Sequence, residues 1–432
     1  MGRTTAIIGG GYSGAMLAVR LAESGATAVL IEKSGEFARG AAYGTRCDSH
    51  VLNVRSGRMS ARADDPDHFV RWLAAHHPAL ADPQGFAPRR LYGDYLQAIL
   101  AEAEATAPGA IVRVAEPALG VTDSGVRMPR GRNIEAEAVV LATGNPEPAA
   151  LGAGDHPNII ANPWAAEALE TVRPSDSIVL LGAGLTMIDV MLALEDRGWV
   201  GRAVALSRRG LLPRPHDPTQ TPVEPLQLAA GPLSARLREV RRRSAAEGWG
   251  AVMDRLRHGN AETWATLPAA ERARFLRHLR PMWDVHRHRL APEPAGRIQR
   301  LMQDQQLVVA AGRIARIEPT AAGVEVHWTR RGDARTERLT GDRLVNCTGP
   351  GYREAAAADR LLAGLTAEGL ARPDALGLGL DVTVDGALIG ADGTPSTRLF
   401  ALGPPARAAL WECTAVPDIR ERIEALAARL AA

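Results

Sequence analysis

Two glycine-rich segments contain the residues with the clearest potential for chemistry. In the first, AIIGGGYSGAMLAVRLAE, the glycines Gly9, Gly11 and Gly14 have the spacing GxGxxG. Such a turn between a strand and a helix brings backbone N–H groups close to the pyrophosphate of a dinucleotide. Glu32 ends the next apolar run, where a carboxylate accepts hydrogen bonds from a ribose. The first segment therefore predicts a dinucleotide site.

The second segment, SIVLLGAGLTMIDVMLALED, has glycines at Gly182 and Gly184 but Met187 in place of the third. The strand expected after it, AVALS, is followed by Arg208 and Arg209, where the first segment has its acid. Arginine pairs with a 2′-phosphate in bidentate fashion, whereas a carboxylate repels it. The sequence thus predicts NADPH here in preference to NADH, although arginines at a strand end can also be merely solvated.

Each glycine turn needs a strand before it and a helix after it. Both segments supply an apolar, β-rich run followed by apolar residues at helical spacing. Short β-rich runs with polar turns follow in each half, and each set ends in a Thr-Gly step, at Thr143-Gly144 and at Thr348-Gly349. This architectural repeat predicts an α/β protein with two Rossmann-like dinucleotide-binding domains, the second inserted into the first.

The same repeat sets the expected domain limits. Residues 1–160 are expected to form the first domain, residues 161–348 the second, and residues 349–432 to complete the first. Residues 210–303 are rich in Arg, Ala and Leu at helical spacing and predict a helical insertion in the second domain.

Composition excludes several other classes of protein. A chain of 432 residues with 46% hydrophobic and 23% charged residues is typical of a globular protein of two or three domains. A net charge of +2 gives no reason to expect nucleic acid or a membrane as a partner. No apolar run approaches the ~20 residues needed to span a bilayer, and the N-terminus enters a strand at once, without a signal peptide.

The cysteines argue for a reducing compartment. Cys47, Cys347 and Cys413 are odd in number, far apart, and show neither a CxxC pair nor a zinc pattern. We therefore expect a cytoplasmic bacterial enzyme without a metal site.

Six longer stretches are more particular than the glycine turns. With them the chain resembles, over nearly its whole length, a family of bacterial FAD/NAD(P)-binding proteins related to flavin-containing and N-hydroxylating monooxygenases. The resemblance implies a two-domain flavoprotein, with FAD in the first site and a nicotinamide nucleotide in the second. The stretches are GAAYGT (40–45), HVLNVRSGRMS (50–60), DDPDHFVRWL (64–73), RRLYGDYL (89–96), RPMWDVHRHRLAP (280–292) and LGPPARAALWECTAVPDIR (402–420).

Some of these stretches suggest flavin contacts on their own chemistry. The small residues of GAAYG, ending in Tyr43-Gly44, form a loop over which an isoalloxazine can slide. Asn53, Arg58, Met59 and Ser60 follow in a segment expected to be extended, with side chains able to reach the polar edge of the flavin. The alternative is a surface loop with a buried Met59.

A second set of flavin contacts is expected near the C-terminus. Related flavoproteins often place an aspartate after the glycine that corresponds to Gly403, but this chain has Pro404 there. A helix is expected to begin near Thr414–Pro417, and its positive end can face the reduced flavin, unless it is only a packing helix. The full set of predicted cofactor contacts is Gly9, Gly11, Tyr12, Ser13, Gly14, Glu32, Lys33, Tyr43, Asn53, Arg58, Met59, Ser60, Thr143, Gly144, Gly182, Gly184, Leu185, Thr186, Arg208, Arg209, Gly349, Gly403, Trp411 and Thr414.

The segment from Trp283 to Arg289 is unusually dense in His and Arg. It makes His286 and Arg287 candidates for catalysis, together with Asn53, and so many arginines would suit an anionic substrate. A solvated, arginine-rich helix is the alternative. Two histidines two residues apart point in different directions on a helix, which disfavours joint metal binding.

Three functions are compatible with this pattern. The first is an NADPH-consuming, FAD-dependent monooxygenase that uses molecular oxygen, through a C4a-peroxyflavin, on a small nucleophile such as an amine or amino acid. The second is an NAD(P)H:acceptor reductase or dehydrogenase without oxygen insertion. The third, a non-catalytic redox sensor, fits least well because both nucleotide motifs are intact. No short motif marks oxygen activation, so the sequence does not separate the first two.

Overall fold

The computed structural model describes residues 3–217 and 224–432, so residues 218–223 of the predicted insertion lie outside it. The chain forms two compact units and crosses between them four times. Unit 1 comprises Met1–Asp48, Val54–Pro146 and Tyr352–Ala432, and unit 2 comprises Ser49–Asn53 and Glu147–Gly351. These limits differ from those expected at 160 and 348, and the excursion of residues 49–53 has no counterpart in the sequence-based division.

Unit 1 is built on a six-stranded sheet in the order β15-β16-β7-β1-β2-β3. All neighbours are parallel except β15, which pairs antiparallel with β16 at one edge. The central strands β1 and β7 are buried along almost their whole length, as expected for a parallel sheet covered on both faces. The strands are β1 (Thr4–Ile8), β2 (Thr27–Ile31), β3 (Ile111–Val114), β7 (Ala138–Leu141), β15 (Ala387–Ile389) and β16 (Pro395–Ala401).

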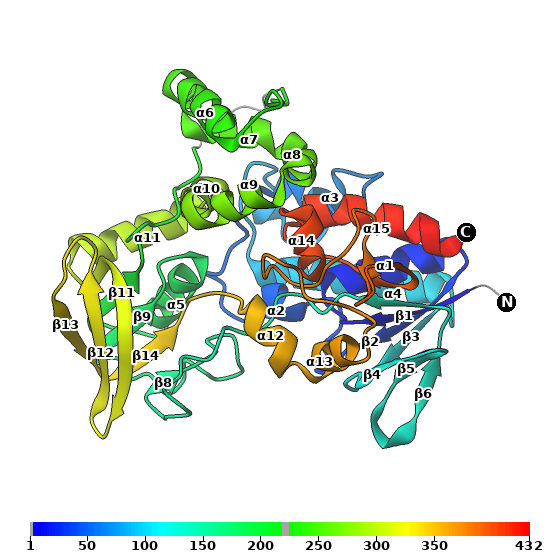
Figure 1. Cartoon of the computed structure of the whole chain (residues 1–432), viewed down its shortest axis with the longest axis horizontal. Coiled ribbons are helices and arrows are strands. Elements are labelled where there is room, and N and C mark those ends of the chain that lie inside the picture. Colours follow the sequence, from blue (N-terminus) through cyan, green and yellow to red (C-terminus); the bar gives the residue numbers. More distant parts are fainter. Residues whose placement is uncertain (1–2, 218–223) are drawn as a thin grey trace. The chain divides into compact units, whose positions relative to one another are not determined.

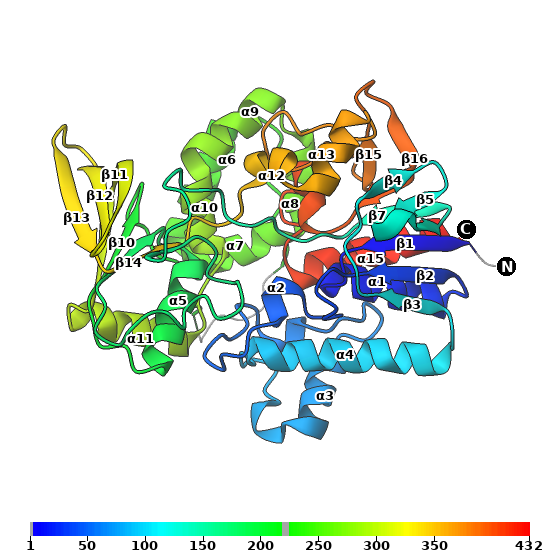
Figure 2. The same ribbon diagram turned by 90° about the horizontal axis from the view of Figure 1, so that it is seen from below.

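Helix α1 is the centre of the helical layer of unit 1, because it packs against β2 and against both α4 and α15 (Figure 2). A small antiparallel sheet of three strands, in the order β4-β5-β6, adds a second layer. The elements are α1 (Tyr12–Glu23), α2 (Gly40–Tyr43), α3 (His68–His76), α4 (Arg89–Thr106), β4 (Gly120–Thr122), β5 (Gly125–Arg127), β6 (Asn133–Glu135), α12 (Tyr352–Ala358), α13 (Arg360–Ala367), α14 (Arg407–Leu410) and α15 (Val416–Ala431).

Unit 2 has a seven-stranded sheet in the order β13-β12-β11-β10-β9-β14-β8. Strand β11 first pairs parallel with β10 and then continues as one strand of an antiparallel extension with β12 and β13, shown in yellow in Figure 1. Helices α5 and α11 pack on the parallel part. The elements are β8 (Ile159–Ile160), β9 (Ile178–Leu181), α5 (Leu185–Asp196), β10 (Ala203–Ser207), α11 (Pro292–Gln303), β11 (Leu307–Thr320), β12 (Gly323–Arg330), β13 (Thr336–Gly341) and β14 (Arg343–Asn346).

The helical insertion expected over residues 210–303 is shorter in the structure, because α11 packs against α5 and β11 of unit 2. The group of helices that remains lies between β10 and α11 in the chain. It has a small apolar core of its own, and backbone hydrogen bonds join its two ends, from Arg214 N to Val285 O and from His216 N to Leu290 O. The helices are α6 (Leu233–Glu247), α7 (Trp249–Leu256), α8 (Asn260–Thr266), α9 (Ala269–Arg274) and α10 (Arg280–Arg287), with a π-helical turn at Phe275–Leu279. We call residues 210–291 the helical insertion.

The α/β architecture with two Rossmann-like sheets, predicted from the sequence, is confirmed. None of the described helices is long and apolar enough to cross a lipid bilayer.

Candidate nucleotide-binding sites

The turn between β1 and α1 is shaped by glycines that leave no room for a side chain. Gly9 has a φ of +110°, and a Cβ on it would lie 2.3 Å from Ala142 O. A Cβ on Gly14 would lie 1.9 Å from Gly9 O, because α1 packs directly on the turn. No side chain caps α1 at Gly11, so its first N–H groups are available for an anion. The backbone therefore fits a pyrophosphate.

Glu32 lies beside this turn. Its Oε2 accepts a hydrogen bond from Gly10 N at 2.8 Å, and its Oε1 accepts from the backbone and hydroxyl of Ser34 at 3.0 Å each. A carboxylate has about four lone-pair sites, so Glu32 can still accept hydrogen bonds from ribose hydroxyls. Gly40, the first residue of α2, approaches so closely that its Cβ would lie 3.1 Å from Gly11 Cα. The small residues of GAAYG thus lie against the glycine turn, as a short helix rather than a loop. Lys33 beside Glu32 is exposed, and Tyr43 at the end of α2 is half-buried.

The C-terminal part of unit 1 reaches the same end of α1. A Cβ on Gly403, whose φ is +74°, would lie 2.6 Å from Ser13 Oγ. Tyr12 Oη donates to Val416 O at 3.4 Å, which brings the starts of α1 and α15 together. Cys413 Sγ donates to Gly403 O at 3.1 Å, and burial raises the pKa of this thiol to about 12. The Cys413 thiol is therefore protonated at neutral pH, and its hydrogen bond to Gly403 O stabilises the segment between Gly403 and α15.

Trp411 and Thr414 belong to this segment. Trp411 is buried, and the guanidinium of Arg407 lies 4.5 Å from its ring centroid, in range of a cation–π interaction. Thr414 is half-buried just before α15. Unit 1 thus brings Tyr12, Ser13 and Gly403 together at the start of α1, and Trp411 and Thr414 lie in the segment that connects Gly403 to α15.

The segment expected to be extended is not. Ser56–Arg58 forms a 3₁₀ turn, because Ser56 N and Gly57 N donate to Gly85 O and Pro83 O and fold the chain back. Met59 and Ser60 are fully buried, and Ser60 O accepts from an Arg420 guanidinium N–H at 2.8 Å. The expected extended geometry is therefore wrong, while the flavin contacts of these residues stay a prediction.

The turn between β9 and α5 repeats the geometry of the first. Gly182 has a φ of +116°, and its Cβ would lie 2.3 Å from Cys347 O. Apart from its chain neighbours and the helix backbone, no atom of the described residues lies within 4 Å of a Cβ placed on Gly184, and none of their side chains caps α5 there. Leu185 and Thr186 begin the helix, and Met187 is fully buried in the core. This turn therefore also presents open backbone to a ligand.

Backbone pairing aligns the two turns residue by residue. Gly9 N donates to Ile31 O at 2.8 Å, and Gly182 N donates to Leu206 O at 2.9 Å. Ser207 is therefore the equivalent of Glu32, and Arg208 and Arg209 follow one and two residues later. We expected Arg208 and Arg209 at the position of Glu32, but that position is taken by Ser207, one residue earlier. A hydroxyl in that position, which accepts from Gly210 N at 3.0 Å, removes the charge that would repel a 2′-phosphate.

The Thr-Gly steps also match. Gly144 has a φ of +73° and Gly349 a φ of +83°, and each closely follows the strand end whose carbonyl lies over the glycine turn of its own unit. Thr143 and Thr348 are both exposed at these turns.

Asn53 lies in a different unit from the residues that follow it. Residues 49–53, which we call the strap, are anchored to unit 2 at three points. Arg297 donates to Ser49 Oγ at 2.5 Å, His50 Nε2 lies 2.8 Å from Asp189 O in α5, and His216 Nε2 lies 3.0 Å from Asn53 O. Asn53 is thus grouped with the unit of the second turn, apart from Arg58, Met59 and Ser60. The sequence carried no signal for the strap.

His286 and Arg287 pack within the helical insertion. The imidazole of His286 stacks on Trp249, with centroids 4.6 Å apart and planes at 16°. Burial, and then the charges of Arg214 and Arg289, lower the pKa of His286. Arg287 is buried, and the neighbouring Arg289 pairs with Asp254. These contacts account for the conformation of the segment, and the catalytic roles of His286 and Arg287 stay predictions.

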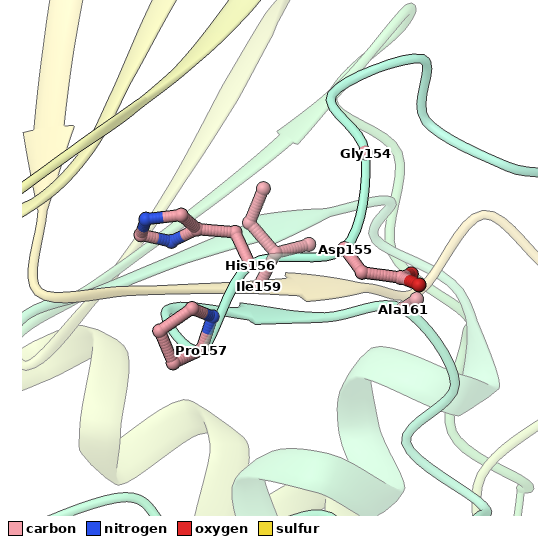
Figure 3. A pocket seen from close by; sticks show the side chains of 6 residues that line it. All are labelled: Gly154, Asp155, His156, Pro157, Ile159 and Ala161. Atoms are coloured by element: carbon pink, nitrogen blue, oxygen red, sulfur yellow. The ribbon is translucent and has the colours of Figure 1, made fainter.

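Two other features of unit 2 lack convergent chemistry. In Figure 3 the side chains of Asp155 and His156 point to opposite sides of the pocket loop 154–161. On the β11–β12 hairpin, His327 Nε2 lies 2.8 Å from a carboxylate oxygen of both Glu318 and Glu325. Arginines pair with the same two carboxylates, so ion pairs among the chain's own residues balance this cluster.

The comparisons with known proteins agree with this geometry. Residues 6–146 match the model of the FAD-NAD(P)-binding family. The search of curated proteins finds no significant match. The matched segment contains the first glycine turn and most of the unit 1 sheet.

Solved structures show the same fold over the full chain. Ornithine hydroxylase from Pseudomonas aeruginosa is 17% identical, with a TM-score of 0.67 over 100% of this chain and 99% of that one. L-lysine 6-monooxygenase from Pseudomonas syringae is also 17% identical, with a TM-score of 0.68 and the same coverage. Thioredoxin reductase from T. acidophilum is 10% identical, with a TM-score of 0.55 over 99% of this chain and 98% of that one. The chain therefore shares the two-domain α/β fold of these proteins.

Proposed function

We propose that the protein is an NADPH-dependent FAD monooxygenase that oxygenates the nitrogen of a small amine or amino acid. The observation that carries the proposal is the matched pair of glycine turns, of which one is followed by Glu32 and the other by Ser207, Arg208 and Arg209. The first suits the ribose of FAD, and the second suits a nucleotide with a 2′-phosphate. The full-length likeness to an ornithine hydroxylase and an L-lysine 6-monooxygenase supports N-oxygenation.

The chain's own residues would bind and orient the two nucleotides. Gly9, Gly11 and Gly14 would take the FAD pyrophosphate on the start of α1, with Glu32 on the ribose. The start of α15, beside Gly403, would direct its positive end to the flavin and favour negative charge there. Gly182 and Gly184 would likewise take the pyrophosphate of NADPH on the start of α5.

FAD supplies the redox chemistry when bound, since it accepts a hydride and passes electrons to oxygen. The balanced reaction is NADPH, H⁺, O₂ and R–NH₂ giving NADP⁺, H₂O and R–NHOH. One oxygen atom enters the new N–O bond, and the other leaves as water with two protons and two electrons. We place Asn53, His286 and Arg287 as candidates for contacting substrate, with an arginine for a substrate carboxylate.

A coupling assay on the FAD-loaded protein tests the proposal. NADPH oxidation, O₂ uptake, H₂O₂ and hydroxylamine product would be measured together with a panel of amino acids and diamines, including ornithine, lysine and cadaverine. We expect one substrate to stimulate NADPH oxidation and to yield hydroxylamine in near-equal amount. Turnover of an artificial acceptor under nitrogen, with only H₂O₂ in air for every substrate, would instead identify an acceptor reductase. Failure of the purified protein to retain FAD would exclude both.

A second assay tests the nucleotide assignment. We expect the KM for NADPH to be at least about tenfold lower than that for NADH, because a charge-assisted phosphate contact contributes about 1.5–3 kcal/mol. Arg208→Ala and Arg209→Ala should remove most of this difference. A wild-type preference for NADH would overturn the assignment.

A further inference from the structure

The end of β10 lies beside arginines from two other elements. Gly210, which follows Arg209, folds over β11 so that its Cβ would lie 3.1 Å from Ala311 Cβ. On its other side Ala311 accepts a hydrogen bond from Arg331 N at 2.8 Å. Gly210, the residue after Arg209, and the backbone of Arg331 therefore both lie against Ala311 of β11.

The helical insertion supplies the other arginine. A guanidinium N–H of Arg209 donates to the backbone carbonyl of Arg277 at 3.4 Å. Arg277 lies in the π-helical turn Phe275–Leu279, a rare distortion that often occurs at functional sites. This contact holds Arg209 against the insertion and places Arg277 next to the end of β10.

The charges of these arginines are not neutralised. Around them most arginines have an acid: Arg274 pairs with Glu271, Arg280 with Asp284, Arg330 with Glu337 and Arg335 with Asp333. In contrast, the exposed side chains of Arg208, Arg277 and Arg331 form no ion pair with any side chain that the structure describes, which leaves out residues 1–2, 218–223 and 354–356. Neighbouring like charges without counterions repel each other, and an anion bound among them would relieve the repulsion.

We propose that Arg277 and Arg331 complete, with Arg208 and Arg209, a four-arginine site for the 2′-phosphate of the nicotinamide nucleotide. This inference rests on the proposed use of NADPH. A 2′-phosphate carries up to about two negative charges and has three acceptor oxygens, so it can engage several guanidinium groups at once. Two of the arginines come from outside the β9–α5–β10 motif, so the helical insertion and the antiparallel extension both take part in choosing the nucleotide.

Binding of two small nucleotides to the FAD-loaded protein tests this site without relying on turnover. Adenosine 2′,5′-bisphosphate carries the 2′-phosphate, and 5′-AMP is the matched ligand without it. Calorimetry should show that Arg277→Ala and Arg331→Ala each weaken the bisphosphate roughly fivefold to tenfold and leave 5′-AMP unchanged. Arg274→Ala and Arg335→Ala are matched controls, because these arginines already have acid partners, and they should change neither ligand.

The outcomes separate the two levels of the proposal. If wild type binds the bisphosphate no better than 5′-AMP, the proposed use of NADPH is wrong. If wild type prefers the bisphosphate and Arg208→Ala loses that preference, while Arg277→Ala and Arg331→Ala retain it fully, the four-arginine site is wrong and the proposed function stands. A steeper loss of bisphosphate affinity with added salt in wild type than in Arg277→Ala would give independent support, since removing a charge reduces screening sensitivity.

Discussion

The two glycine turns have nearly the same backbone and very different surroundings. In both, a glycine with a φ near +110° lies under the carbonyl of a strand end, only 2.3 Å from where its Cβ would be, and its N–H donates to the next strand. The first turn is then closed in by α2 and bonded to Glu32, whereas the second is open at Gly184 and followed by Ser207 and two arginines. Steric need fixes the shape of each turn, and we expect the residues after the following strand to decide which nucleotide it takes.

The helices meet the two turns differently as well. Gly14 allows α1 to pack on the first turn at a distance that no other residue permits. In the second turn the corresponding residue is Met187, which fills the core of unit 2 instead. The first turn therefore requires a glycine at this position, whereas the second has a large side chain there that packs in the core.

The largest effect is expected for Gly14→Ala. Its Cβ would lie 1.9 Å from Gly9 O, a backbone atom that cannot move without the turn. Overpacking of this kind costs about 3 kcal/mol. We expect a lower midpoint of urea unfolding, measured by circular dichroism, and loss of the FAD absorbance from the purified protein. A variant that purifies yellow with an unchanged midpoint would show that the first turn does not depend on this approach.

The second largest effect is expected for Ser207→Glu, which places a carboxylate in the second turn at the position of Glu32 in the first. The carboxylate would repel a 2′-phosphate and accept from an unmodified ribose, so the KM ratio of NADPH to NADH should rise at least about tenfold. Ser207→Ala is the control, and steady-state kinetics should show an unchanged ratio for it. Equal ratios in both variants would mean that the register between Glu32 and Ser207 has no bearing on the nucleotide.

Gly184→Ala should affect binding without affecting stability. Beyond its chain neighbours and the helix backbone, no atom of the described residues lies within 4 Å of its Cβ, and its φ of −91° suits alanine. The free energy of unfolding should therefore change by no more than about 1 kcal/mol. The new methyl group would occupy the place where a pyrophosphate approaches the backbone, and NADPH should bind about tenfold more weakly by fluorescence titration. Weaker binding accompanied by a large loss of stability would contradict the open geometry.

The smallest effect concerns pH and the helical insertion. Because the pKa of His286 is lowered in the folded protein, the unfolded chain binds the proton more readily, and stability is lost as pH falls below about 6.5. The thermal midpoint should fall by about 2 °C between pH 7.5 and 5.5, and His286→Phe should reduce this dependence. His278→Phe, an exposed position in the π-helical turn, is the control. An identical pH dependence in wild type and His286→Phe would exclude this histidine as the source.

The sequence predicted those parts of the fold that are determined by residues close together in the chain. Positive-φ glycines, buried parallel strands and arginine-rich helices each leave a short-range pattern, and the two motifs and the insertion follow from them. Contacts over long sequence distances left no such pattern. The approach of Gly403 to Ser13, and that of Gly40 to Gly11, depend on how distant segments pack.

The candidate site was predictable to the same extent. Both turns and the arginines after β10 are visible in the sequence, but the register that aligns Ser207 with Glu32 needs the hydrogen bonds of two strands. Likewise, the sequence places Asn53 beside Arg58, yet His216 and Arg297 hold the strap on the other unit. Arg277 and Arg331 stand out only when their neighbours' acids are known.

Because the chain crosses between its units four times, the two units cannot be completed in the order in which they begin during synthesis. Unit 2 has all of its sheet once β14 ends at Asn346, whereas the sheet of unit 1 still lacks β16, which ends at Ala401. Strand β1 has both of its neighbours, β2 and β7, once the chain reaches Leu141, but β7 must wait for β16 on its other side. Domains usually fold in the order in which they emerge. Here the unit that begins first is the one that finishes last.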